Sequence, residues 1–135
     1  MNKLKGRIID IESSPHMSIV DVDVDGDIFC SLVLETPQTA DYLKKGTSIT
    51  LLFKETEVSI ARNLTGEISL RNRFKAVIRK LEPSQILTKV VLDYKTKEIV
   101  SIISSRSAQS MGLRPGDCVE GLVKTNEVSL LREGE

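Results

Sequence analysis

The sequence is poor in the residues on which most metal and redox sites depend. It has one histidine, two cysteines and no tryptophan. His16 has no cysteine or second histidine at ligand spacing, so we expect no metal site around it. Cys30 and Cys118 are too few for a disulfide framework. Both stand in apolar, strand-like surroundings, where a free cysteine usually behaves as a small buried residue.

Net charge and long apolar runs are also missing. Nineteen basic residues balance nineteen acidic ones, so the broad attraction behind non-specific binding to nucleic acid or membrane surfaces is absent. No apolar run approaches the roughly 18 residues of a membrane span, and the first residues lack the apolar centre of a signal peptide. The few aromatic residues are dispersed in apolar runs, which favours core positions over a platform for stacking bases. We expect a soluble, cytoplasmic protein that binds neither nucleic acid nor membranes.

Sequence motifs of the common enzyme classes are not found either. The chain has no glycine-rich nucleotide loop, no nucleophile elbow and no zinc-protease helix motif. Asp21, Asp23, Asp25 and Gly26 match the first half of a calcium loop, but Leu32 occupies the position of its bidentate glutamate. The alternating valines fit the acidic face of a hairpin instead. We therefore predict a protein that is not an enzyme and holds no metal cation.

What the chain does contain is an internal repeat. A shift of 70 positions places residues 2–62 over residues 72–132 without a gap, with 16 identities in 61 pairs. The clearest block aligns Lys54, Glu57, Val58, Ser59 and Arg62 with Lys124, Glu127, Val128, Ser129 and Arg132. A half of about 60 residues buries little surface by itself. We expect the halves to share a core or to assemble with other copies.

Each half predicts the same order of elements. An apolar-rich strand is followed by a hairpin, a polar stretch with one or two helical turns, a glycine and a final strand. Asp25 and Gly26 supply a tight hairpin turn in the first half. The fold class predicted is all-β with short helices, arranged as tandem OB-like small β-barrels. The expected division is a first domain over 1–63, a connecting strand over 64–71 and a second domain over 72–135.

A set of hydrogen-bond donors remains in the second half. Its members are Ser69, Arg71, Asn72, Ser104, Ser107, Lys124 and Thr125. Hydroxyls and cations without a carboxylate suit a tetrahedral oxyanion, because such an anion accepts hydrogen bonds from every direction and donates few or none. Serine, arginine and lysine on loops are more often solvated surface, which is the alternative interpretation of the same residues.

Residues 69–131 resemble a Mop domain, the OB-like module of the molybdate-binding molbindins, also called the transport-associated OB (TOBE) domain. The family's Ser-Ala-Arg-Asn opening is matched by Ser69, Leu70, Arg71 and Asn72, with Ala76 at a position where the family has glycine. Its Thr-x-x-Ser segment, Leu-Gly-Leu-x-x-Gly turn and closing lysine are matched by Ser104, Ser107, Met111, Gly112, Leu113, Gly116, Lys124 and Thr125. Two such modules in one chain resemble the free-standing di-domain molbindins.

This resemblance implies reversible binding of molybdate, with tungstate as an alternative ligand, for intracellular storage or homeostasis of molybdenum. It also implies homotrimers. In the family the anion lies at an interface, where the opening serine and arginine and the late lysine of one module meet the hydroxyls of another. That arrangement would place Ser69, Arg71 and Lys124 opposite Ser104 and Ser107.

The first half is a more divergent copy. Met1, Leu34 and Pro37 stand where the second half has Arg71, Ser104 and Ser107, and Lys54 alone is kept as a possible secondary site. Arg62 and Asn63 echo the opening motif at the end of the first half, with no role assigned. The alternative function is an OB-type interaction or ligand-sensing module that binds protein or nucleic acid.

Overall fold

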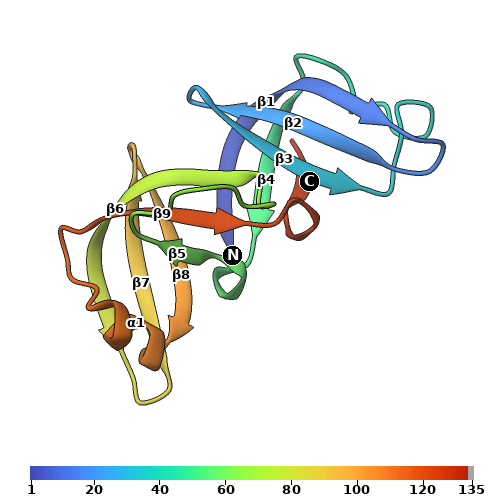
Figure 1. The fold of residues 1–135 in the computed structure, drawn as a ribbon. Helices are drawn as coiled ribbons and strands as arrows, with labels where there is room; N and C mark the ends of the chain where they lie inside the picture. The colour runs from blue at the N-terminus through green and yellow to red at the C-terminus, as the bar shows by residue number, and fades with distance from the viewer. Residues whose placement is uncertain (134–135) are drawn as a thin grey trace.

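The structure is a computed structural model that describes residues 1–133. Over those residues the chain forms two five-stranded antiparallel sheets with one short α-helix and two 3-10 turns. Figure 1 shows the two sheets as neighbouring units, with the N-terminus between them. The predicted all-β fold with two OB-like barrels is confirmed. No helix of the described part is long and apolar enough to cross a membrane.

The repeat is visible in the order of the elements. The first half contains β1 (Asn2–Ser13), β2 (Ser18–Val24), β3 (Asp27–Val33), β4 (Ser48–Phe53), η1 (Glu55–Glu57) and β5 (Ser59–Ala61). The second contains β6 (Asn72–Pro83), β7 (Leu87–Tyr94), β8 (Lys97–Ser104), α1 (Ser105–Met111), β9 (Cys118–Val123), η2 (Thr125–Glu127) and β10 (Ser129–Arg132).

The two halves exchange their last strands. The sheet orders are β10-β4-β1-β2-β3 and β5-β9-β6-β7-β8, so β5 pairs with β9 and β10 pairs with β4. Each barrel therefore takes one strand from the other half (Figure 1). The expected domain boundary at residue 63 separates the two sequence repeats, but it does not separate the two sheets, because each sheet contains a strand from both repeats. The expected connecting strand over 64–71 is wrong: these residues form bends with no ladder partner, because polar side chains and Gly66 at φ 85° favour irregular backbone.

A two-residue turn closes the hairpin in each half, and the turn predicted at Asp25 and Gly26 is confirmed, whereas the one expected at Thr96 and Lys97 lies one residue earlier. Asp25 and Gly26 have φ of 50° and 94°, as a tight two-residue hairpin turn requires. The second hairpin turns at Lys95 and Thr96, with Lys95 at φ 55°. The polar stretch of the second half forms α1, which ends at Gly112 in the left-handed conformation. Its counterpart in the first half forms consecutive turns without a helix, in which Ala40 N–H donates to the Thr36 carbonyl (2.9 Å) and Leu43 N–H to the Ala40 carbonyl (3.3 Å).

One hydrophobic cluster runs through both halves, so the predicted shared core is confirmed. At its centre the rings of Phe29, Phe74 and Tyr94 meet, with centroids 5.9 Å apart for Phe29–Phe74 and 5.3 Å for Phe74–Tyr94. Phe74 faces Gly121 across β6 and β9, where a Cβ on the glycine would lie 2.2 Å from the ring. The first half has two leucines at these positions, so the larger Phe74 is offset by the smaller Gly121.

The tips of the two hairpins meet with opposite charges. Lys97 Nζ lies 2.6 Å from Asp25 Oδ2, and Lys95 Nζ lies 3.3 Å from Asp27 Oδ2. The buried Tyr94 donates its hydroxyl to Asp27 (2.6 Å). The hydrogen bond from Lys97 lowers the pKa of Asp25. Burial, and then the hydrogen bond to Asp27, raise the pKa of Tyr94. The first half therefore presents an acidic tip to a basic tip of the second.

The Tyr94 hydroxyl makes stability fall in alkali. The pKa of Tyr94 in the folded chain is above its value of about 10 in the unfolded chain. The hydroxyl therefore contributes fully to the free energy of unfolding below about pH 10, and the contribution is lost at higher pH because the unfolded chain ionises first. We expect the stability difference between the unaltered chain and Tyr94→Phe to shift by about 1 kcal/mol from pH 8 to pH 11 in favour of the variant. Urea unfolding at both pH values measures this, and a constant difference would contradict it.

Candidate functional site

The two donor segments of the second half meet because β6 and β9 pair in register. Asn72, the first residue of β6, lies opposite Val123, the last residue of β9. Residues just before 72 and just after 123 are therefore brought to the same end of the ladder. Lys124 is extended and exposed, and the half-buried Thr125 opens η2. The turn packs on β3 of the first half, where Ser31 Oγ donates to the Val128 carbonyl (2.5 Å).

A surface hollow lies at this junction. We call it the donor hollow, and its volume is about 370 Å³. It is lined by Ser69, Leu70, Lys124, Thr125 and Asn126 of the second half and by Ile19 and Leu32 of the first. No carboxylate lines it, and Lys124 forms no salt bridge with an acid of residues 1–133. The structure thus brings together three of the predicted residues, and Lys124 is free to meet an anion.

Arg71 lies beside the donor hollow, in a second and smaller one of about 140 Å³ that we call the acidic hollow. Its lining is Asp10, Glu12, Ile19, Asp21, Cys30, Arg71 and Thr125. Because Ile19 and Thr125 line both hollows, the exposed Arg71 stands next to the donor set. Cys30 donates its thiol to Asp21 Oδ1 (2.9 Å). Burial, and then this contact, raise the pKa of the thiol to about 11, while the charge of Arg71 opposes the rise.

Asn72 has a different role from the other predicted residues. Its side chain is fully buried, and its amide accepts from Cys30 N–H (2.7 Å) and donates to the Cys30 carbonyl (2.9 Å). Asn2 makes the equivalent pair with Val100 (2.8 Å for both bonds). Each asparagine joins the first strand of one half to the third strand of the other. Asn72 therefore fixes the backbone beside Arg71 and presents no free donor to an anion.

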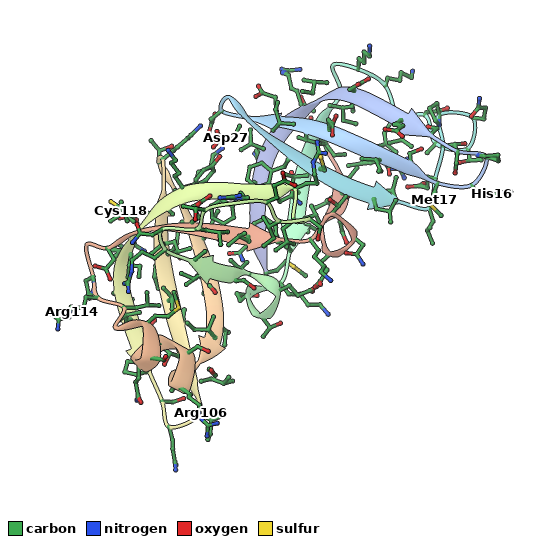
Figure 2. All side chains as sticks on the ribbon, viewed as in Figure 1. His16, Met17, Asp27, Arg106, Arg114 and Cys118 are labelled. Carbon is green, nitrogen blue, oxygen red and sulfur yellow. The ribbon has the colours of Figure 1, made fainter. Side chains whose placement is uncertain are left out.

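Ser104 and Ser107 lie elsewhere in the chain, at the start of α1. Ser104 Oγ accepts from Ser107 N–H (3.0 Å) and contacts Ser107 Oγ (2.9 Å), and both residues are exposed. Figure 1 shows α1 at the outer end of the second barrel, whereas β9 points toward the centre of the molecule before Lys124. Arg106, which marks this outer end in Figure 2, projects away from the rest of the protein. Within one chain the two serines do not meet the other donors.

The first half does not reproduce the donor hollow. Lys54 precedes η1 as Lys124 precedes η2, and η1 packs on β8 as η2 packs on β3. Glu55, however, stands where the second half has Thr125. Glu55 pairs with the N-terminal ammonium of Met1 (2.6 Å), so this position offers an anion a carboxylate in place of a hydroxyl donor. The structure thus supports the second half as the better oxyanion site.

The residues that sequence analysis set aside are placed without a ligand role. His16 lies at the far tip of the first barrel (Figure 2), and residues 1–133 contain no cluster of histidine, cysteine or carboxylate side chains that could hold a metal ion. Cys30 is buried, but Cys118 is exposed, so the expectation of burial is wrong for Cys118. Phe29, Phe53, Phe74 and Tyr94 are buried and offer no platform to bases. A larger hollow of about 600 Å³ over β6 and β9 contains none of the predicted site residues.

Sequence analysis missed the contribution of the first half. Ile19 and Leu32 form one cross-strand pair of the β2–β3 hairpin and wall the donor hollow, and Asp21 lies in the acidic hollow. Nothing in the local pattern distinguishes these residues from an ordinary exposed hairpin face. Their part in the site depends on how the two halves pack.

Known proteins resemble the chain both in sequence and in fold. Residues 68–130 match the TOBE domain family. The molybdenum-pterin-binding protein MopA of Rhodobacter capsulatus is 29% identical over 108 residues, which make up 78% of this chain and 41% of MopA. The chain thus spans less than half the length of this curated relative.

Solved structures include close matches to the fold. The cytoplasmic molybdate-binding protein ModG, in a crystal form with molybdate bound, superposes with a TM-score of 0.90 and 22% identity over 97% of this chain and 95% of its own. A molybdate-binding protein from Sporomusa ovata is 36% identical, covers 50% of this chain and 100% of its own, and gives a TM-score of 0.49. The second repeat is therefore similar in sequence to the TOBE domain, and the tandem fold of the chain is similar to that of ModG.

Proposed function

We propose that this protein binds molybdate reversibly at the donor hollow, with Ser69, Arg71, Lys124 and Thr125 as its ligands from one copy. The observation that carries the proposal is a hollow lined by cationic, hydroxyl, amide and apolar groups, without a carboxylate, beside a free guanidinium. A donor-rich lining favours a fully deprotonated dianion, because its oxygens only accept hydrogen bonds. MopA is named for binding molybdenum-pterin and ModG for binding molybdate, and these names support molybdate as that anion.

Selectivity follows from protonation and size. Monohydrogen phosphate must bury a donor that finds few acceptors in such a lining, which costs free energy. Sulfate carries no proton but is smaller than molybdate, so the same donors cannot all contact it at once. Tungstate, which matches molybdate in charge and shape, is expected to bind similarly.

Ser104 and Ser107 complete the site from another copy of the chain. They lie exposed at the outer end of one barrel, where a neighbour can reach them. A second copy also has a surface to dock on, because Met17, Ile19 and Leu34 are exposed apolar residues around the donor hollow and the adjoining end of β3. A homotrimer closes such head-to-tail contacts into a ring. Light scattering in solution distinguishes a trimer from a monomer or dimer.

The biological role we propose is a store or buffer for molybdenum in the cytoplasm. Reversible binding requires no covalent step, so the residues of the donor hollow only bind and release the anion. The ligand would be held as the intact oxyanion and released when its free concentration falls.

Calorimetry tests the proposed function. We expect molybdate and tungstate to bind with a dissociation constant on the order of micromolar or below, and phosphate to give no measurable heat at the same concentrations. Sulfate serves as the size control and is expected to bind far more weakly. Absence of heat with molybdate, or equal heats for molybdate and phosphate, would show that the hollow is not a molybdate site.

A further inference from the structure

Arg71 shares the acidic hollow with three carboxylates that the proposed function does not use. Asp10 and Glu12 come from β1 and Asp21 comes from β2, so all three belong to the first half. Arg71 is the one cation among the residues that line this hollow. Asp10 forms an exposed ion pair with Lys45 at 4.0 Å, and among residues 1–133 neither Glu12 nor Asp21 forms a salt bridge. The carboxylates thus face a guanidinium that an anion also needs.

Asp21 is the carboxylate that another residue of the acidic hollow orients. The buried thiol of Cys30 donates to its Oδ1 at 2.9 Å, and this leaves Oδ2 available to a second donor. Cys30 is itself held in place, because its backbone N–H and carbonyl pair with the Asn72 amide, next in sequence to Arg71. The same asparagine therefore fixes the thiol that orients Asp21 and the backbone that carries Arg71.

The repeat shows that these residues occur as a set. At the equivalent contact on the other side of the molecule, Asp21 and Cys30 are replaced by Val91 and Val100. There the position of Arg71 is occupied by Met1. The arginine and the carboxylate that faces it are thus present together in one contact between the halves and absent together from the other. Among the carboxylates of the hollow, Glu12 is kept as Glu82, whereas Asp21 changes together with Arg71 and Cys30.

We propose that Asp21, oriented by Cys30, competes with the bound anion for Arg71 and thereby sets the affinity of the oxyanion site. In the anion-free chain the guanidinium lies in the acidic hollow, where it forms no salt bridge with an acid of residues 1–133 but is attracted by the charge of the carboxylates around it. To bind molybdate it turns to the donor hollow across the shared Thr125 and leaves the carboxylates. Apparent affinity is reduced by the fraction of chains in which Arg71 is held away. Asp21 acts here as a positioning residue, and the proposal rests on molybdate binding as proposed above.

Asp21→Asn in the full chain tests this competition. The variant keeps an amide oxygen for the Cys30 thiol and removes only the charge. Because an exposed ion pair contributes little to binding or stability, we expect molybdate to bind about three to five times more tightly by calorimetry. Asp23→Asn is the matched control, since it removes the same charge from the same strand but lies outside the acidic hollow. Its affinity is expected to change less than twofold.

A double variant separates competition from simple charge repulsion. When Arg71→Gln is also present, Asp21→Asn is expected to give no further gain in affinity, because the group for which the two anions compete is gone. An unchanged or weaker affinity for Asp21→Asn, an equal gain for Asp23→Asn, or a gain that persists with Arg71→Gln would each overturn the proposal. If the unaltered chain gave no heat with molybdate, the proposed function itself would fail. An affinity that Asp21→Asn leaves unchanged contradicts the competition alone.

Discussion

Replacing Arg71 with alanine is expected to weaken molybdate binding by about 100-fold. A guanidinium can give an oxyanion two parallel charge-assisted hydrogen bonds, and loss of such a contact typically costs about 2–5 kcal/mol. Arg71 stands beside the donor hollow without a salt bridge to any acid of residues 1–133, so the loss falls on the anion complex rather than on the fold. Calorimetry measures the affinity, and thermal unfolding without ligand is expected to be unchanged.

Lys54→Ala is the matched control, because Lys54 occupies the position of Lys124 in the first half. We expect its effect on affinity to stay within about twofold, since Glu55 next to it makes that surface unfavourable for an anion. Arg71→Lys keeps the charge but loses the planar fork, and it is expected to recover only part of the affinity. Equal losses for Arg71→Ala and Lys54→Ala would mean that both halves bind molybdate.

Local sequence signals were sufficient for most of the fold. Alternation of apolar and acidic residues with period two predicts β2 and β3, and the Asp25–Gly26 turn joins them in register. These patterns span only a few residues, so one copy of the repeat is sufficient to predict the strands, and the second copy supports the prediction. The helical turns at Ser105–Met111 follow in the same way.

The strand exchange could not be predicted, because the exchanged strands are nearly the same in sequence. Glu57, Val58 and Ser59 are identical to the residues that lead into β10, so either strand fits the edge of either sheet. The choice depends on which edge the connecting chain reaches, which is a long-range property. The pairing of β6 with β9 lies within one half, and it brings Ser69 close to Lys124.

The site was predictable only for the residues that one half supplies. Ser69, Lys124 and Thr125 gather at one end of a ladder within the second repeat. In the acidic hollow Asp21 of the first half lies beside Arg71 and Thr125 of the second half. No sequence pattern within β2 predicts which residues of the other half Asp21 will meet. Asn72 illustrates the reverse: it belongs to the family's opening motif, yet its side chain joins two strands in the interior.

Asn72→Ala is expected to destabilise the protein by about 3 kcal/mol, or roughly 10 °C in Tm. The substitution leaves the N–H and the carbonyl of Cys30 without partners at a buried position, and each unsatisfied group costs about 1–3 kcal/mol. Asn72→Asp keeps the acceptor for Cys30 N–H but sets a carboxylate against the Cys30 carbonyl, so we expect it to destabilise at least as much. Urea unfolding measures both.

Asn126→Ala serves as the control for this prediction, because Asn126 is exposed on η2 and its loss is expected to change stability by less than about 0.5 kcal/mol. Asn2→Ala removes the equivalent bonds to Val100 and is expected to resemble Asn72→Ala. If Asn72→Ala cost less than Asn126→Ala, the amide would not be what joins the halves. If only Asn2→Ala were destabilising, the Asn72–Cys30 hydrogen bonds would contribute less to stability than the Asn2–Val100 bonds. The backbone beside Arg71 would then be held by the pairing of β6 with β9 rather than by the first half.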